Sequence, residues 1–460
     1  MLVRLEARRR LDKSLFTRAM DNISNVSFKK HAWHEARTAK SICHRYGMLD
    51  MTALRRQPPN DGRKGKITFV SSSILDVDFF ESSTLEILTN LSKRGYSTRL
   101  VAMRSKNACQ VKNSHVHVVQ VPLRHVPIVS NVMYALILLF LVPLHIVFSE
   151  PDFVVTHPDV STISSIPWLF LGKFYRVKFI LDIRSTPVEP RGFQGFLQKS
   201  LFATSIIIAK KFFDGMTTIT NSMKKEVCEN FSINPDNVGV WTSGVSTTLF
   251  RPEDCLAESV DLKKRLRLFR KFVVFYHGGL RRTGGLIETV ESMKMIKRTG
   301  LPIVLFLLGA GSIVETLENL VQSEALQDLV IIHKPVDYLE VPKYIGMSDV
   351  CIIPLPYHPY WRFQCPLKLL EYMAMEKVVI ATDIPAHRLI IGEANCGVYI
   401  SSIKPSEIEK AIVYAYHNRD KLQNWGRTGR KIIEEKYTWE KIAEDLENCM
   451  LSISRSQNRC

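Results

Sequence analysis

Short apolar runs alternate with amphipathic helical segments along most of this 460-residue chain. Strands that are buried on both faces of a parallel sheet are continuous runs of apolar residues, and each parallel connection needs a crossover that is usually a helix. The alternation therefore predicts an α/β protein with parallel sheets. The series occurs twice, first from about Lys66 to Trp241 and again from Phe272 to Thr382.

The apolar runs give the expected strands and the boundaries between domains. Expected strands are 66–72, 97–103, 115–121, 152–156, 178–182, 215–220 and 238–241, then 272–276, 303–308, 329–333, 349–354 and 378–382. The composition changes at Arg251-Pro252, and we place the interdomain linker in the charged stretch that follows, up to Lys271. The expected domains are a basic extension over 1–64, Rossmann-like domains over 65–250 and 251–437, and a crossover helix with tail over 438–460.

Charge is concentrated at the start of the chain. The net charge is +17, and residues 1–66 hold 16 Lys and Arg against 6 Asp and Glu. A basic arm suits an anionic membrane surface or nucleic acid, although a solvated, partly disordered tail is the simpler interpretation. Nucleic-acid binding is not expected, because the charge lies mainly outside the folded body and no base-stacking aromatic motif accompanies it.

Cysteine usage indicates a reducing, cytoplasmic setting. The nine cysteines form no CxxC pair, and several lie in apolar runs, which favours free thiols over disulfides. No metal site is predicted, because the only group of candidate ligands matches no zinc spacing. That group is His31, His34, Cys43 and His44.

The segment from Val126 to Phe148 is almost entirely apolar and approaches the length of a membrane span. Pro143 and His145 interrupt it. Three interpretations stay open: a buried core helix, an interfacial helix partly inserted in one leaflet, and a true span. The span is least favoured, because strands and helices continue on both sides of the segment.

A second stretch, Trp361 to Ala374, combines a helix start with a charged pair. Pro366 suits the first turn of a helix, and Lys368 and Glu371 then lie three residues apart near its beginning. The stretch follows the expected strand 349–354. Ligands bind at the carboxyl ends of strands in doubly wound sheets, and helix N-termini favour anions. The alternative is an ordinary surface Lys–Glu pair.

Several motifs in order make the chain from Lys66 to Leu451 resemble the retaining glycosyltransferases of family 4, the glycosyl transferases group 1 of the GT-B fold. In chain order they are WTSGVSTTLFRP (241–252), FYHGGL (275–280), LGAG (308–311), CPLKLLEYMA (365–374) and YTW (437–439). The resemblance implies two facing Rossmann-like domains and a last helix that crosses back to the first.

The resemblance also implies roles for residues in the second domain. The donor is a nucleoside diphosphate sugar, Glu371 matches the acid that holds the ribose hydroxyls, and Lys368 matches the adjacent basic position. Glycines in the loop let the backbone approach the diphosphate. No cofactor and no divalent metal are expected. The implied donor-binding set is Gly278, Gly279, Arg281, Arg282, Gly309, Gly311, Pro366, Lys368, Leu369 and Glu371.

Two positions depart from the family pattern. A second Glu is common eight residues before Glu371, where this chain has Phe363. The basic residue usual before the last glycine of the loop is Gly284 here, so Arg281 or Arg282 would have to supply the charge that stabilises the leaving diphosphate.

The first domain offers three catalytic candidates. Asp182 ends the expected strand 178–182, Arg184 follows it, and the two resemble a "DiRd" segment of the subgroup. They would contact acceptor or donor, or else only order their own loop. His157 follows the strand ending at Thr156, and imidazole can transfer protons near neutral pH, although a loop histidine is more often structural.

The expected function is therefore transfer of a sugar from a nucleotide sugar to an acceptor, with retention. The expected acceptor is a lipid-linked or surface-polysaccharide precursor, and the expected location is the cytoplasm, peripheral on the inner membrane face. Two rivals are a catalytically inactive donor-binding or scaffolding homologue and a nucleotide-sugar epimerase. The epimerase would need a pair of carboxylates near the sugar, and the sequence shows no convincing pair.

Overall fold

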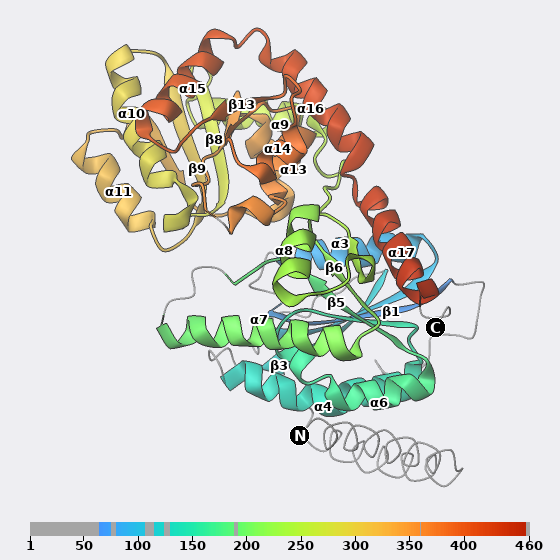
Figure 1. Ribbon diagram of the computed structural model, residues 1–460. Helices are drawn as coiled ribbons and strands as arrows, with labels where there is room; N and C mark the ends of the chain where they lie inside the picture. Colours follow the sequence, from blue (N-terminus) through green and yellow to red (C-terminus); the bar gives the residue numbers. More distant parts are fainter. Residues whose placement is uncertain are drawn as a thin grey trace.

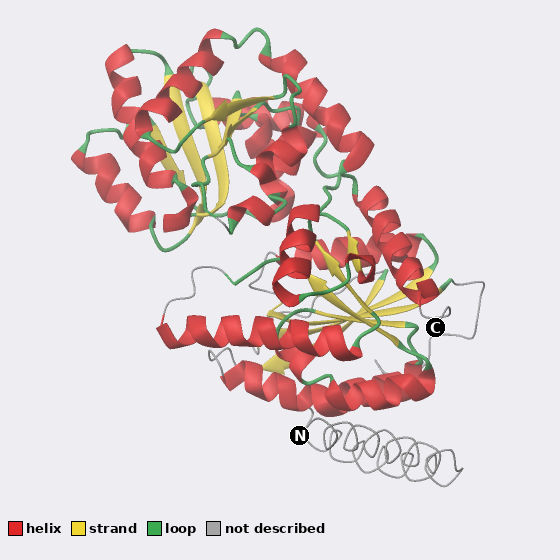
Figure 2. Cartoon of the chain, viewed as in Figure 1, coloured by secondary structure: helices red, strands yellow, loops and turns green. Residues whose placement is uncertain are grey.

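Two parallel sheets, each packed between helices, make up the described part of the chain (Figure 1). The structure is a computed structural model, and it describes residues 64–74, 80–105, 115–123, 129–187, 192–358 and 360–456. The basic extension and the cluster His31, His34, Cys43 and His44 lie outside these residues. Figure 2 shows helices on both faces of the strands in each domain, which confirms the predicted α/β class.

The first domain is built around a seven-stranded sheet with the order β3-β2-β1-β4-β5-β6-β7. Its strands are β1 (Gly65–Ile74), β2 (Tyr96–Ser105), β3 (Val116–Leu123), β4 (Phe153–Thr156), β5 (Lys178–Ile183), β6 (Gly215–Thr218) and β7 (Val238–Val240). Its helices are α3 (Phe80–Lys93), α4 (Val129–Ser149), α5 (Val160–Ile163), α6 (Ile166–Tyr175), α7 (Gly192–Phe212), α8 (Asn221–Phe231) and the 3-10 turn η3 (Pro235–Asn237).

The second domain is built around a six-stranded sheet with the order β10-β9-β8-β11-β12-β13. Its strands are β8 (Phe272–Gly279), β9 (Ile303–Ala310), β10 (Val330–His333), β11 (Val350–Ile353), β12 (Val379–Thr382) and β13 (Gly397–Ile400). Its helices are α9 (Pro252–Arg265), α10 (Leu286–Thr299), α11 (Val314–Ser323), α12 (Val341–Gly346), α13 (Leu367–Ala374), α14 (Pro385–Ile391), α15 (Pro405–His417) and α16 (Leu422–Lys436). Short 3-10 turns are η4 (Arg282–Gly284), η5 (Tyr338–Glu340) and η6 (Trp361–Phe363).

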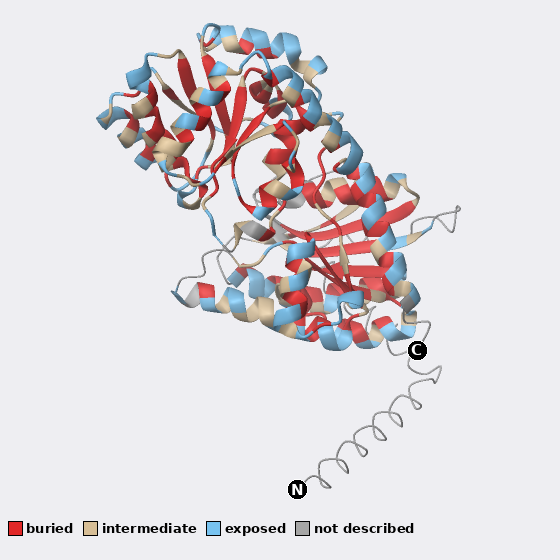
Figure 3. Cartoon of the chain, turned by 45° about the horizontal axis from the view of Figure 1, so that its top comes forward, coloured by how far each residue is buried: buried red, intermediate tan, exposed pale blue. Residues whose placement is uncertain are grey.

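Continuous apolar runs explain why the strands are central. β4, β6, β11 and β12 are buried along their whole length, and Figure 3 shows both sheets as buried layers between exposed helix surfaces. In each sheet, successive strands are added first on one side of the initial strand and then on its other side. The change of side falls between β1 and β4 in the first sheet and between β8 and β11 in the second. Crevices at such switch points are where doubly wound sheets bind ligands.

The last helix, α17 (Trp439–Ser456), returns to the first domain and packs against α3 and β7 (Figure 1). Ile442, Leu446 and Met450 are buried among residues of the first sheet. Glu447 fixes the helix by accepting from Lys64 Nζ at 2.8 Å and from the Tyr96 hydroxyl at 3.1 Å. The predicted crossover helix is thereby confirmed.

The charged stretch that we expected to be a linker is largely helical. α9 occupies Pro252–Arg265 and packs on α12 in the second domain. Its apolar stripe is narrow, because Ser259 and Leu262 are the buried residues, and Lys263 pairs with Asp349 at 2.7 Å. Because most residues of this helix are polar or charged, its composition predicted a linker and not a helix. The helix α14 and the edge strand β13, which are both short, were not predicted from the sequence.

The apolar segment forms α4, which lies on the first sheet with one side buried and the other exposed. By length and composition alone it is a candidate membrane span. Its buried side is tied to the strands by polar groups: the Tyr134 hydroxyl donates to Ser71 O at 2.7 Å, and His145 Nε2 lies 2.7 Å from Thr68 Oγ1. In the structure α4 is thus a layer of the first domain, with one side buried as in the core-helix interpretation and with an apolar outer side that the interfacial interpretation also requires.

Candidate donor site and interdomain contacts

The start of α13 lies where β8 and β11 end, at the switch point of the second sheet. Pro366 is the N-cap residue of this helix, with extended backbone, so its lack of an N–H removes no helical hydrogen bond. Leu369, Leu370 and Met373 are buried on one side of α13 and anchor it to the core. That anchoring holds the side chains of Lys368 and Glu371 in fixed positions.

Glu371 is almost completely buried, with 4% of its surface exposed. Its Oε1 accepts a hydrogen bond of 2.6 Å from the Tyr338 hydroxyl, and its Oε2 lies 3.0 Å from His277 Nε2. Burial raises the pKa of this carboxyl, but the hydrogen bonds from His277 and Tyr338 and the charge of Lys368 outweigh burial and lower the pKa overall. Glu371 is therefore a carboxylate at neutral pH.

His277 and Tyr338 were missed by the sequence analysis. His277 directly precedes the two glycines at the carboxyl end of β8, and that placement at a strand end is the signal that could have found it. Tyr338 lies in η5, far along the chain from Glu371, and its sequence neighbourhood carries no comparable signal. Both residues are distant from Glu371 in the sequence, and folding brings their side chains into contact with it.

Lys368 lies over the glycine loop. Its Nζ donates to the Tyr276 hydroxyl at 2.8 Å and is 4.1 Å from the centre of that ring. Gly278 has φ +115°, and a Cβ there would be 3.1 Å from Lys368 Nζ. A side chain at this position would be strained and would crowd the ammonium group. The Lys368 ammonium group therefore lies directly beside the glycine loop.

The other predicted loop residues fall into two groups. A Cβ at Gly309 would lie 2.0 Å from Gly278 O, and one at Gly311 would lie 2.1 Å from Leu280 O, so backbone packing between the ends of β8 and β9 already requires both glycines. Arg281 and Arg282 are both exposed. Arg281 Nε would be 3.3 Å from a Cβ on Gly279, so its side chain lies beside the loop.

Two positions near Glu371 face the protein interior. The side chain of Leu369 is fully buried, so any contact between this residue and a donor would have to come from its backbone. Phe363, which replaces the second Glu of the family pattern, is buried at the end of η6. Its carbonyl oxygen accepts from Thr220 Oγ1 of the first domain at 3.0 Å. This position is therefore part of the contact between domains.

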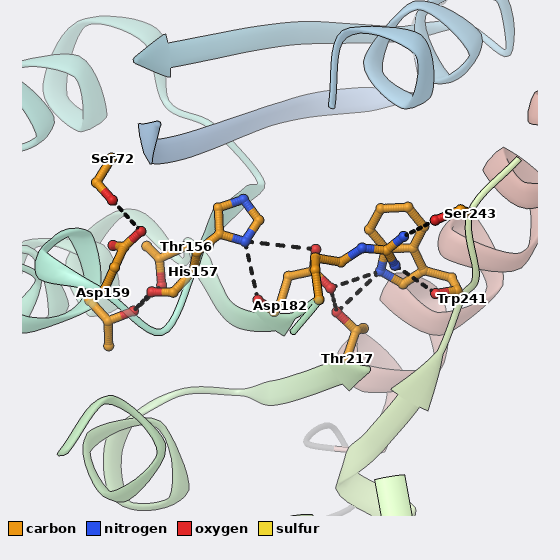
Figure 4. A network of polar contacts seen from close by, with 10 residues as sticks. Ser72, Thr156, His157, Asp159, Asp182, Thr217, Trp241 and Ser243 are labelled. Carbon is orange, nitrogen blue, oxygen red and sulfur yellow. Dashed lines mark hydrogen bonds and ion pairs between the residues drawn. The ribbon is translucent and has the colours of Figure 1, made fainter. Parts of the chain in front are cut away.

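In the first domain, Asp182 is at the centre of a buried polar network (Figure 4). It is 0% exposed, and its Oδ1 accepts from Thr217 Oγ1 at 2.7 Å and from Trp241 Nε1 at 3.0 Å. These bonds hold β5, β6 and the segment after β7 together. The structure places the carboxylate within the domain, where it orders the loop that begins at Trp241.

Arg184 and His157 flank this carboxylate. The Arg184 guanidinium stacks on the Trp241 ring at 3.6 Å and donates to Trp241 O at 2.7 Å and to Ser243 Oγ at 3.2 Å. Burial lowers its pKa, and the charge of Asp182 opposes that effect. His157 is buried, and its Nδ1 donates to Asp182 O at 3.1 Å. The structure therefore brings the three predicted residues together, and their hydrogen-bond partners are other groups of the same chain.

No group of three His, Cys, Asp or Glu side chains suited to a metal ion occurs in the described ranges. The cysteines described there, at positions 228, 255, 351, 365, 396 and 449, are free thiols. Cys365 is buried beside Arg184, Thr242 and Ser243, at the meeting of the two domains, and burial raises its pKa.

Comparison with known proteins agrees with this architecture. Residues 261–432 match the family model of glycosyl transferases group 1. An uncharacterized glycosyltransferase of Methanocaldococcus jannaschii, MJ1607, is 24% identical over 240 residues, which cover 50% of this chain and 58% of that protein. The chain therefore spans little more than half the length of this relative.

Two further proteins match over longer ranges. The capsular polysaccharide biosynthesis glycosyltransferase CapM of Staphylococcus aureus is 21% identical over 373 residues, covering 78% of this chain and 90% of CapM. The crystal structure of HepE from Anabaena in complex with UDP and glucose superposes with a TM-score of 0.65 at 13% identity, covering 84% of this chain and 100% of HepE.

Two facing Rossmann-like domains with a helix crossing back define the GT-B fold of glycosyltransferases. Within that fold, the second domain of this chain matches the family model of glycosyl transferases group 1, in agreement with the resemblance found in the sequence.

Proposed function

We propose that this protein transfers a sugar from a nucleoside diphosphate sugar to an acceptor, with retention of anomeric configuration. The observation that carries the proposal is that the buried Glu371 carboxylate and the Lys368 ammonium project from the same helix start at the switch point of the second sheet, which matches the group 1 family model. A carboxylate can accept from ribose hydroxyls, and a cation beside a glycine loop can meet the charge of a diphosphate.

The proposed chemistry assigns one task to each group. The bond between the sugar C1 and the diphosphate oxygen breaks, a new bond forms between C1 and the acceptor oxygen on the same face, and the acceptor proton passes to the leaving phosphate. Lys368 and the neighbouring Arg281 stabilise the negative charge that develops on the diphosphate. In this proposal the cations of the protein supply that stabilisation and no divalent metal is needed.

A donor screen tests this proposal. The purified protein is incubated with UDP-, GDP- and ADP-sugars, and nucleotide release is measured with and without EDTA. We expect release from one donor class, unchanged by EDTA, and loss of at least about a hundredfold in Glu371→Gln, because one of the two acceptor oxygens and the negative charge are both lost. NMR of the glycoside product gives its anomeric configuration; an inverted product would contradict retention.

The inactive-homologue alternative is favoured by one observation, the buried Phe363 in place of the second Glu. Isothermal titration separates the two functions. Tight binding of a nucleotide sugar without turnover on any lipid or glycan acceptor would support a donor-binding protein. Turnover would establish that this position is dispensable for catalysis.

We further propose that the acceptor is a lipid-linked or surface-polysaccharide precursor, reached from the cytoplasmic face of the membrane. Support comes from CapM, a capsular polysaccharide enzyme, and from the outer surfaces of α4 and α6, which pack side by side. Exposed apolar side chains recur there at helical spacing: Val129, Val132, Met133, Leu136, Phe140 and Phe148 on α4, and Ile166, Phe170 and Phe174 on α6.

The α4–α6 surface, defined by those nine side chains, also carries positive charge. Lys173 shares the exposed side of α6, and Arg176 follows its end. Exposed aromatic residues next to cations suit the interface of an anionic bilayer. The double variant Phe140→Ser, Phe170→Ser should lose pelleting with phosphatidylglycerol vesicles. Leu389→Ser, which changes an exposed apolar side chain of the second domain, is the matched control. Unchanged pelleting in the double variant would overturn this location.

A further inference from the structure

The carboxylate of Glu371 has a defined set of filled and open acceptor positions. An ionised carboxylate has about four such positions, two on each oxygen. The Tyr338 hydroxyl takes one on Oε1 at 2.6 Å, and His277 Nε2 takes one on Oε2 at 3.0 Å. One position on each oxygen is then left for a pair of adjacent hydroxyl groups.

Tyr372 determines which nitrogen of His277 carries the proton. Its hydroxyl accepts from the backbone N–H of His277 at 2.9 Å and lies 3.1 Å from His277 Nδ1. Because the phenol oxygen already accepts the backbone N–H, its own proton is available for Nδ1. The imidazole proton is then on Nε2 and points at Glu371. With the protons placed in this way, the backbone N–H of His277, the Tyr372 hydroxyl and both ring nitrogens of His277 each have a hydrogen-bond partner.

Packing restricts the His277 ring to that orientation. Phe275 stacks on it with ring centres 5.9 Å apart, and the Tyr372 ring meets it edge-on at 5.2 Å. Phe275 and Tyr372 are both fully buried. A ring held on two sides by core side chains has little rotational freedom to lose when a ligand binds, so the carboxylate behind it is preorganised.

Tyr338 approaches Glu371 from the opposite side. Its ring packs edge-on against Phe250, with centres 5.7 Å apart, and Phe250 is fully buried in the segment that joins the two domains. The carbonyl of Phe250 accepts from Arg430 Nη1 at 3.1 Å. The hydroxyl of Tyr338 is therefore directed at Oε1 by a support that is separate from the one that holds His277.

We infer that His277 and Tyr338 are positioning residues that orient the Glu371 carboxylate toward the vicinal 2′- and 3′-hydroxyls of the donor ribose. The inference rests on the proposed donor and deepens it. Each of the two holds one carboxylate oxygen and leaves the second acceptor position of that oxygen for one hydroxyl of the diol. The site consequently selects ribonucleotides over 2′-deoxyribonucleotides, and both positioning residues contribute to this selection.

The test is a ratio of affinities. Dissociation constants of UDP, GDP and ADP and of their 2′-deoxy counterparts are measured by titration calorimetry on the full chain. For the base that binds, the wild-type protein should prefer the ribonucleotide by about tenfold or more, because the deoxy compound leaves a buried charged acceptor position unfilled. Tyr338→Phe and His277→Leu should each reduce that preference several-fold while leaving deoxynucleotide affinity nearly unchanged.

Conservative variants separate positioning from loss of fold. His277→Gln keeps an N–H near the Nε2 position and should restore part of the ribose preference that His277→Leu loses. Tyr414→Phe removes a half-exposed hydroxyl on α15, far from the site, and is the matched control for Tyr338→Phe. Thermal unfolding checks each protein.

Three results would overturn the inference. A preference unchanged in both Tyr338→Phe and His277→Leu would show that neither residue orients the carboxylate. Tighter ribonucleotide binding in Tyr338→Phe would show that the hydroxyl competes with the ribose. If the wild-type protein binds none of the three ribonucleotides, the proposed function itself fails, and the positioning roles fail with it.

Discussion

Asp182 and Glu371 are both buried carboxylates near the carboxyl edge of a parallel sheet, yet their surroundings differ. Asp182 accepts from Thr217 and Trp241, groups of its own domain, and lies near the buried Arg184. Glu371 is supported by His277 and Tyr338 and has Lys368 and the glycine loop beside it. The position of a carboxylate at a strand edge therefore does not determine which groups surround it.

The difference lies in what each carboxylate supports. Hydrogen bonds to Asp182 connect β5, β6 and the segment after β7, so they contribute to the stability of the first domain. Bonds to Glu371 come from two separate supports and orient a charge beside a cation. Variants of the first should unfold the protein, and variants of the second should spare the fold and impair donor binding.

The largest expected effect follows Asp182→Ala. The change leaves the Thr217 hydroxyl without its acceptor, leaves the Trp241 indole N–H only its longer bond to Thr217 Oγ1 at 3.3 Å, and removes a negative charge that acts on the buried Arg184. We expect a loss of about 4 kcal/mol in the free energy of unfolding, measured by urea denaturation. Asp182→Asn keeps one acceptor oxygen and should lose much less. A stable Asp182→Ala protein without activity would instead give this carboxylate a role in the reaction.

The substitution Phe363→Glu introduces the second Glu of the family pattern and tests whether a carboxylate at this position increases turnover. The position is buried against the first domain, so the new carboxylate would lose its hydration. We expect the free energy of unfolding to fall by about 3 kcal/mol with no gain in turnover, whereas Phe363→Leu should cost about 1 kcal/mol. Higher turnover at unchanged stability would contradict the buried placement.

Lys368→Met removes a charge and keeps the apolar stem. Because the ammonium group lies beside the glycine loop, we expect kcat/KM to fall about thirtyfold, roughly 2 kcal/mol of transition-state stabilisation, with little change in Tm. Lys410→Met, at an exposed position on α15 that pairs with Glu407, serves as the control. Equal kinetics in the two variants would show that Arg281 and other groups, and not Lys368, stabilise the charge of the diphosphate.

The smallest effect expected concerns pH. The pKa of Glu371 lies below its ordinary value near 4.5, because the hydrogen bonds from His277 and Tyr338 and the charge of Lys368 outweigh burial. A lowered folded-state pKa contributes stability that is present above the unfolded value and is lost as the pH falls through the folded value. Nucleotide affinity should therefore be unaffected by Glu371 between about pH 5 and pH 8 and fall only in more acid solution. Isothermal titration across this range checks it; a rise in affinity below pH 5 would contradict the assignment.

Local spacing explains which parts of the fold and site were predictable. The alternation of apolar runs with helices specified two parallel sheets, since strand and helix periods are set by neighbouring residues. The same holds for the start of α13, where Pro366, Lys368 and Glu371 lie within one and a half turns. Elements with weak periodicity, such as α9 with its two buried residues, were missed because charge concealed the apolar stripe.

The sequence by itself determined the fold class, the crossover helix by family resemblance, and the charged pair on α13. Only the tertiary structure decided that Asp182 and Arg184 face inward, that α4 buries one side on the sheet, and that His277 and Tyr338 support Glu371. The reason is physical: the burial of a side chain and its partners depend on segments far apart in the chain, which only the packing of strands and helices brings together.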